Sequence, residues 1–254
     1  MSRILKIGGT ALAVLLVLFT IIFIFFPGLP TYFKVKHDFE YIDTKIGSYE
    51  TVSVPDDFKR YSKGGLSIKV PDGFESKETE DMLSLKGETA SVLVTVSDSV
   101  ESEKIMRDYA ESQGGVYDKW ENYKYSESDY REFFKKMKAP FPNTEVASSD
   151  ILWFNKGGFT AKDCLKLRGK NKDIFLEFAE IKDECWGMEE TWVTEKDDFT
   201  MYVCGSKEND TVSYSYWTAT VFPENCGSEY YFIMIRKTDE KTINQILSSI
   251  KLDK

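Results

Sequence analysis

The longest hydrophobic stretch of the chain lies near its N-terminus. Arg3 and Lys6 are followed by 20 almost wholly apolar residues, Ile7 to Phe26. At a helical rise of about 1.5 Å per residue, such a run spans the roughly 30 Å hydrocarbon layer of a bilayer. The pattern predicts a transmembrane helix. A buried core helix fits poorly because the run is too long and has no polar face.

A cleaved signal peptide is the alternative interpretation, because a short basic start before an apolar run is also typical of export signals. The apolar part of such a signal has about 7–15 residues, fewer than this run. Residues 27–33, PGLPTYF, contain no small-x-small cleavage site, and no cysteine lies near the run to accept a lipid. We therefore expect an uncleaved signal anchor.

The charges that flank the run predict its orientation. Arg3 and Lys6 precede it, and basic residues favour the cytoplasmic side of a membrane. Lys34, Lys36 and the only histidine, His37, follow it and reduce the charge difference. We expect a single-pass protein of the cell membrane, with a cytoplasmic N-terminus and the C-terminal domain outside.

Beyond this run the pattern is that of a folded domain. Residues 31–60 are weakly periodic and predict a stalk. Alternating apolar and polar positions predict strands over 66–70, 82–86, 90–97, 199–205 and 211–222. Runs that are apolar on both faces predict buried strands over 174–181 and 230–235. Asn155-Lys156-Gly157-Gly158 predicts a hairpin that joins strands 151–154 and 159–167.

Three stripes of apolar residues at helical spacing predict amphipathic helices, and we interpret each stripe as core packing. The first is preceded by Glu101 and Glu103, the second begins at Ser126 or Ser128, and the third is capped by Thr238. In chain order the stripes are Ile105, Met106, Tyr109 and Ala110; Tyr130, Phe133, Phe134 and Met137; and Ile243, Ile246, Leu247 and Ile250.

Together these elements predict an α+β fold, in which a mostly antiparallel sheet carries helices on its faces behind a single N-terminal transmembrane helix. The expected parts are a cytoplasmic tip and anchor (1–30), a stalk (31–60) and an extracytoplasmic domain (61–254). The 18 Phe, 14 Tyr and 5 Trp residues indicate a real core rather than disorder.

Charge limits the partners. The first 30 residues hold two of the 33 basic and none of the 42 acidic side chains, so residues 31–254 carry a net charge of −11. We expect this net charge to attract neither nucleic acid nor anionic lipid. The expected partners are the membrane, through the N-terminal helix, and an unknown protein or cell-envelope ligand.

Two short stretches resemble a known family. Residues 61–74, YSKGGLSIKVPDGF, and the ending in which strand 230–236 runs into a helix that closes with ILSSIKL (246–252) are similar to the start and finish of PsbP-like domains. The resemblance implies an α/β/α sandwich that serves as a non-catalytic adaptor, assembly or lipoprotein-like module. The acidic segment 182–198 departs from the family as an insertion. No functional residue carries over, and the photosynthetic role of plant members is not implied.

Four cysteines, Cys164, Cys185, Cys204 and Cys226, are candidates for chemistry. They form no Cys-x-x-Cys, and no histidine follows His37, so ordinary zinc-ligand spacing is absent; an all-cysteine metal site stays open. An even count in an exported domain favours disulfides. Strand alternation and turn positions favour Cys164 with Cys204 and Cys185 with Cys226, and partly buried thiols are the alternative.

Catalytic motifs are largely missing. A single histidine beside the membrane leaves no base for a distal serine or cysteine nucleophile, and the sequence contains no phosphate-binding, dinucleotide-binding or EF-hand motif. We therefore expect no catalytic residue, no metal ligand and no cofactor. Asn209-Asp210-Thr211 matches a glycosylation acceptor.

Two functions remain. The first is a membrane-anchored extracytoplasmic binding or interaction module without catalytic activity. The second is an extracytoplasmic hydrolase that acts on carbohydrate or cell-wall material through paired carboxylates. Trp186 and Trp192 are its candidate sugar-stacking platforms, with core or rim packing as the alternative role. The candidate carboxylates are Glu184, Glu189, Glu190, Asp197 and Asp198, although acidic residues are so abundant that a solvated acidic face explains them better.

Overall fold

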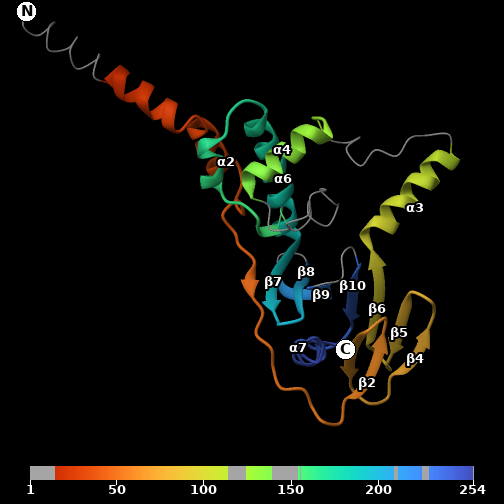
Figure 1. Cartoon of the computed structure of the whole chain (residues 1–254). Coiled ribbons are helices and arrows are strands. Elements are labelled where there is room, and N and C mark those ends of the chain that lie inside the picture. Colours follow the sequence, from red (N-terminus) through yellow and green to blue (C-terminus); the bar gives the residue numbers. More distant parts are fainter. Residues whose placement is uncertain are drawn as a thin grey trace, which may run out of the picture. The chain divides into compact units, whose positions relative to one another are not determined.

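The computed structural model describes residues 15–113, 124–138, 154, 156–208, 211–224 and 229–253, which Figure 1 traces along the chain. The chain divides into two compact units. Unit 1 comprises Met1–Lys45 and Trp120–Gly187, and unit 2 comprises Ile46–Lys119 and Met188–Lys254. Residues 31–45, which the sequence pattern assigned to a stalk, belong to unit 1.

Unit 2 is built on an eight-stranded sheet of order β1-β7-β8-β9-β10-β6-β5-β4. Every neighbouring pair is antiparallel except β1 with β7, which confirms the mostly antiparallel α+β prediction for the described strands. The strands are β1 (Gly47–Ser48), β4 (Glu75–Glu78), β5 (Met82–Lys86), β6 (Ser91–Asp98), β7 (Glu189–Glu195), β8 (Phe199–Glu208), β9 (Thr211–Pro223) and β10 (Glu229–Arg236).

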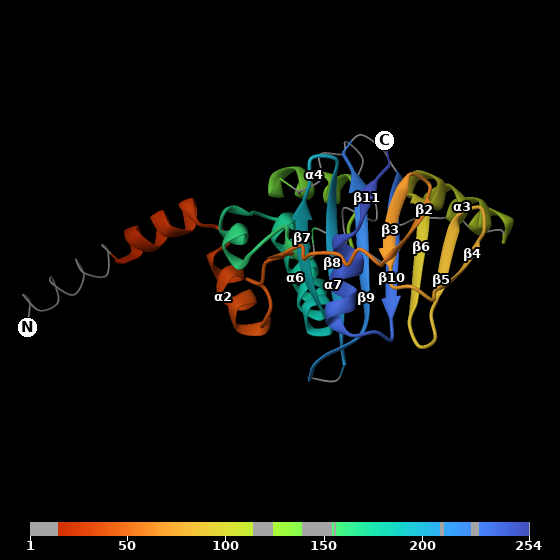
Figure 2. The same ribbon diagram turned by 90° about the horizontal axis from the view of Figure 1, so that it is seen from below.

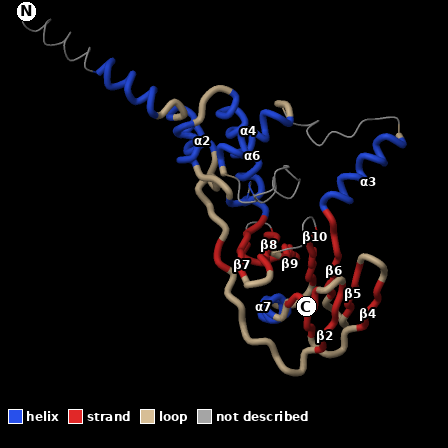
Figure 3. The backbone as a smooth tube through the Cα atoms, in the orientation of Figure 1, coloured by secondary structure: helices blue, strands red, loops and turns tan. Residues whose placement is uncertain are grey.

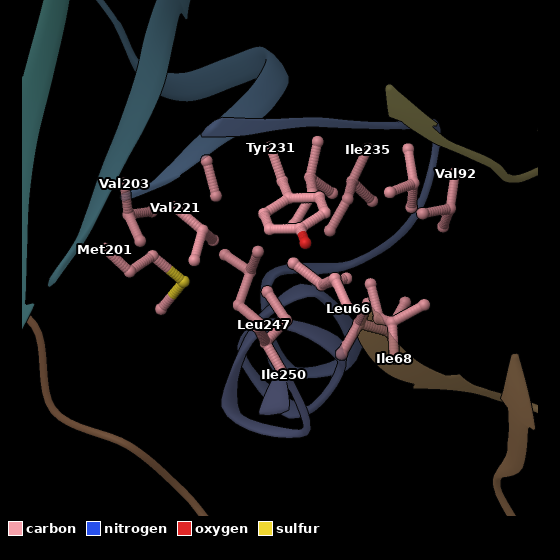
Figure 4. Close-up of a cluster of buried hydrophobic side chains, with 14 of the residues drawn as sticks. Leu66, Ile68, Val92, Met201, Val203, Val221, Tyr231, Ile235, Leu247 and Ile250 are labelled. Atoms are coloured by element: carbon pink, nitrogen blue, oxygen red, sulfur yellow. The ribbon is translucent and has the colours of Figure 1, made fainter. Parts of the chain in front are cut away.

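A second sheet and one helix cover a face of this sheet (Figure 2). The second sheet has the order β11-β3-β2 and consists of β2 (Lys59–Lys63), β3 (Leu66–Val70) and β11 (Lys251–Leu252). The helix is α7 (Glu240–Ser248), whose Ile243, Ile246 and Leu247 are buried in one cluster with apolar side chains of both sheets (Figure 4). The predicted apolar stripe is confirmed. The cap is Asp239 rather than Thr238, because the Asp239 carboxylate accepts the Thr242 N–H at 3.0 Å.

The helix α3 (Ser99–Ser112) follows β6 and confirms the first predicted helix. Two residues of its predicted stripe are not packed into a core, however. Ile105 is 60% exposed and Tyr109 is 64% exposed. Spacing predicted the helix correctly but could not show whether another element covers it.

The described part of unit 1 contains helices and no strands (Figure 3). They include the helix Leu15–Phe25, α2 (Leu29–Asp38), α4 (Glu127–Met137), the 3-10 helix η1 (Ala161–Lys166) and α6 (Lys170–Met188). Aromatic rings fill the core: the Phe133 ring stacks on Phe178 with centroids 5.6 Å apart, and Phe154 stacks on Phe159 at 4.7 Å. Helix α4 begins with a capping box formed by Ser126 and Asp129. Ser126 is one of the two caps that the sequence predicted.

Two strands predicted in this region are not strands. Residues 174–181 lie in α6, because Ile174, Phe178 and the buried Lys182 recur every fourth residue and face one core. Short apolar runs fit a buried strand and a buried helix equally well. Residues 159–167 contain η1 instead of a strand. The expected hairpin is helical at Phe154 and Lys156, while residues 151–153 and Asn155 lie outside the described residues.

The packing of α7 generates a stability prediction. Leu247→Ala should lower the free energy of unfolding by about 2–5 kcal/mol, because it leaves a cavity in the core of unit 2. Lys241→Ala, on the exposed side of the same helix, should change it by less than about 0.5 kcal/mol. Urea unfolding followed by circular dichroism measures both, and equal effects would contradict the described core.

Candidate functional site

The first described element is an apolar helix, Leu15–Phe25. Every residue from 15 to 26 is exposed. The only polar side chain among them, Thr20, donates its hydroxyl to the Leu16 carbonyl at 2.8 Å, so its hydrogen bond is satisfied inside the helix. This helix offers an apolar surface on all sides and no polar group that requires water.

Within the described residues, no single helix has the length and apolar character needed to cross a membrane. The helix Leu15–Phe25 and α2 (Leu29–Asp38) meet both criteria as a pair, bent by 76° at the break between them. The predicted span from Ile7 to Phe26 begins before this helix, and residues 7–14 lie outside the described residues.

A tight junction joins the apolar helix to unit 1. Gly28 is buried, and its N–H donates to the Leu165 carbonyl at 3.0 Å. A Cβ at this glycine would lie 1.8 Å from the Cys164 carbonyl oxygen, so no larger residue fits. Arg168 Nη2 donates to the Ile24 carbonyl at 2.8 Å, which satisfies a C-terminal carbonyl and complements the helix dipole. The apolar helix is thereby fastened to η1.

Unit 1 also carries an open pocket of about 370 Å³, which we call the acidic pocket. The Glu177 carboxylate is held by Tyr130, whose hydroxyl lies within hydrogen-bond distance of both carboxylate oxygens, at 3.0 and 2.9 Å. Burial raises the pKa of Glu177, and the hydrogen bond from Tyr130 opposes that rise. Asp173 accepts the Tyr125 hydroxyl at 3.0 Å. The lining residues are Lys34, Phe39, Lys124, Asp173, Leu176, Glu177 and Glu180.

These carboxylates do not form a metal site. Nowhere in the described part of the chain do three or more His, Cys, Asp or Glu side chains come together in a way that could hold a metal ion. The pocket combines charges of both signs. Behind it, the fully buried Tyr130 that donates to Glu177 stays protonated, since burial raises the pKa of Tyr130 well above its usual value. Such an arrangement suits the binding of a polar group.

Lys182 is the most unusual charged residue of unit 1. It is fully buried in α6, and its Nζ donates to the Phe159 carbonyl at 2.5 Å and lies 5.0 Å from the centre of the Phe159 ring. Burial lowers the pKa of Lys182 to about 8, against the opposing charges of Asp43 and Asp163. The sequence pattern missed this residue, because it ended the predicted strand at residue 181 and assigned Lys182 to the acidic insertion 182–198.

The cysteines lie in different settings from those predicted. Cys164 is buried in η1, where its thiol donates to the Ala161 carbonyl at 3.1 Å, and burial raises its pKa to about 12. Cys204 is buried in β8, with Sγ 3.4 Å from Thr191 Oγ1. No disulfide links these two, so the pairing of Cys164 with Cys204 is not confirmed. Cys185 lies within α6 rather than in a turn, and Cys226 lies outside the described residues.

The tryptophans are packed. Trp186 is 4% exposed, and its Nε1–H donates to the Lys156 carbonyl at 2.7 Å. Trp192 stacks on Trp217 with centroids 5.4 Å apart, and its Cδ1 lies against the Cα of Gly47. These contacts favour the packing role that sequence analysis left open over sugar stacking.

The candidate carboxylates are also scattered. Glu184 is exposed on α6, whereas Glu189 and Glu190 are consecutive in β7 and so point to opposite faces of the sheet. Asp197 and Asp198 lie in the turn between β7 and β8. None of the five lines the acidic pocket.

Comparisons with known proteins give little further information. No protein-family model and no curated protein sequence matches the chain. Among solved structures, it is similar to the solution structure of cyanobacterial PsbP (CyanoP) from Synechocystis sp. PCC 6803, with 11% sequence identity and a TM-score of 0.33. The match covers 81% of this chain and 98% of that chain. PsbP is also the family that the chain's ends resemble, but a TM-score this low supports no argument about function.

The buried amine generates a pH prediction. The pKa of Lys182 is lowered to about 8, so the folded protein binds fewer protons than the unfolded chain between pH 8 and about 10.5. The contribution of Lys182 to stability should therefore rise across this window. In Lys182→Met that rise should be absent. Urea unfolding of both chains across the window measures the difference, and identical pH slopes would contradict the assignment.

The tyrosine at the acidic pocket generates another prediction. Tyr130→Phe should lower the free energy of unfolding by about 1–3 kcal/mol at neutral pH, because the half-buried Glu177 carboxylate loses its hydroxyl donor. The loss should shrink at acid pH, where Glu177 becomes neutral. Tyr125→Phe is the matched control, since its partner Asp173 is exposed and should lose little. Equal losses in both variants, at both pH values, would show that the Tyr130 bond has no special role.

Proposed function

We propose that this protein is a membrane-anchored, non-enzymatic interaction module. The helix Leu15–Phe25 is the visible part of an anchor that runs from Ile7 to Phe26. The anchor holds the two folded units at the outer face of the cell membrane, where they meet a protein or a cell-envelope ligand. Tethering raises the local concentration of the units for partners at that surface.

The exposed apolar helix is the observation that supports this function. Leucine, isoleucine, valine and phenylalanine each favour membrane insertion by about 0.3–0.6 kcal/mol near the helix centre. All residues from 15 to 26 except Thr20 are of these four types. Insertion of this segment is therefore favoured by something on the order of 5 kcal/mol. In water the same surface would be a strong liability for aggregation.

The alternative, a hydrolase, has less support. Its candidate platforms are Trp186, which is buried, and Trp192, which stacks on a neighbouring tryptophan. A glycosidase requires two carboxyl groups about 5–10 Å apart on either side of the bond to be cleaved, and the five candidate carboxylates are scattered over both units. The acidic pocket lies elsewhere and has no tryptophan in its lining.

The anchor is tested by placing charges in it. Leu18→Asp with Ile22→Asp puts two carboxylates one helical turn apart, each at a cost of about 2.5–3.5 kcal/mol near the helix centre. The wild-type chain should stay in the membrane pellet after alkaline carbonate extraction, and the double variant should move to the supernatant. Ile105→Asp with Tyr109→Asp is the matched control, because this exposed apolar pair of α3 has the same spacing. Release of the wild-type chain, or release of the control to the same extent as the anchor variant, would contradict the proposal.

The orientation rests on Arg3 and Lys6 before the helix and is tested separately. Protease added to intact cells should digest the C-terminal domain and leave a cytoplasmic marker whole. A protected C-terminus would place the units inside the cell and overturn the extracytoplasmic assignment.

A further inference from the structure

A run of basic side chains lies in the segment that contacts the end of the apolar helix. Residues 162–172 contain Lys162, Lys166, Arg168, Lys170 and Lys172 and a single acidic residue, Asp163. The Asp163 carboxylate is occupied by the Thr160 N–H and hydroxyl, at 2.6 and 3.0 Å. This segment includes η1, which the junction at Gly28 holds against the helix end.

Most of these charges have no acidic partner among the described residues. Lys170 pairs with Asp129 at 3.0 Å. For the residues that the structure describes, no ion pair involves Lys162, Lys166 or Lys172. Lys162, Lys166 and Arg168 are exposed, and Lys172 is half-buried. We call Lys162, Lys166, Arg168 and Lys172 the basic collar.

Two observations place the collar at the level of the lipid headgroups, given the anchor proposed above. The hydrogen bond from Arg168 to the Ile24 carbonyl sets a guanidinium beside the last turn of the apolar helix. The 76° bend then turns α2 across the helix axis, so that α2 runs along a bilayer surface when the apolar helix crosses it. Phe33 of α2 is 63% exposed, and aromatic residues favour this interface.

From this geometry we propose that the basic collar binds the phosphate groups of anionic phospholipids. Arginine forms bidentate hydrogen bonds with phosphate, and lysine contributes a flexible point charge. The apolar helix ends at Phe25 and Arg168 lies beside its last turn, so the proposal places the collar in the layer of the lipid phosphates. The contact would fix unit 1 against the membrane surface, in addition to tethering it there.

This inference differs from what the net charge predicts. Residues 31–254 carry −11 overall, which led us to expect no attraction to anionic lipid. Electrostatic interactions at physiological ionic strength are screened over about 8 Å, so a lipid phosphate responds to nearby side chains rather than to the total charge. Within the collar segment, basic residues outnumber the one acidic residue.

Hydrogen–deuterium exchange of the full chain in nanodiscs tests the proposal. Exchange in peptides that cover residues 161–172 should be several-fold slower in discs that contain phosphatidylglycerol than in discs of phosphatidylcholine alone, and high salt should remove the difference. The variant Lys162→Glu, Lys166→Glu, Lys172→Glu should lose the difference at low salt too. The matched control is Lys77→Glu, Lys86→Glu, Lys104→Glu, three exposed lysines of unit 2, and it should behave as wild type.

The outcomes separate the collar from the anchor. Exchange in α4 and α6 verifies that the collar variant is folded. If the chain co-elutes with both kinds of disc but residues 161–172 exchange equally in both, the collar proposal is wrong and the anchor stands. If the unit 2 control also lost the difference in exchange between the two kinds of disc, the collar proposal would be wrong. Failure to co-elute with either disc would overturn the anchor itself.

Discussion

An apolar helix that exposes all of its side chains is the constraint on which the account of this protein depends. The helix Leu15–Phe25 has no polar face, and its side chains are exposed among the described residues, so its apolar surface requires a nonpolar partner or environment. Buried Gly28 and the Arg168 hydrogen bond fasten its last turn to η1. Whatever surrounds the helix is therefore also close to the part of unit 1 that contains η1.

Much of unit 2 could be predicted from the sequence, because its strands alternate cleanly and its last helix has a single buried stripe. Strand β5 and the stripe of α7 agree with their predicted residues. Unit 1 could not be predicted in this way. Its run 174–181 is apolar at helical and strand spacing alike, and only the packing of Phe178 and Lys182 against the aromatic core distinguishes a helix from a strand.

The side-chain contacts of unit 1 could not be predicted for the same reason. Tyr130 and Glu177 are 47 positions apart and meet only because α4 packs near α6. The disulfide prediction for Cys164 depended on the expected export of the domain and on a strand that proved to be η1. The sequence PGLP around Gly28 was a visible signal of a turn, but the closeness of Cys164 could be seen only in the fold.

The most direct test of the central claim labels the membrane-embedded surface of the intact chain. A lipid-soluble carbene reagent, photolysed in membranes that hold the full protein, marks the residues in contact with the hydrocarbon layer, and mass spectrometry locates them. The proposed anchor predicts labelling concentrated in residues 7–26, with little in unit 2. Labelling absent from residues 15–26, together with modification of the same segment by a water-soluble reagent, would contradict it.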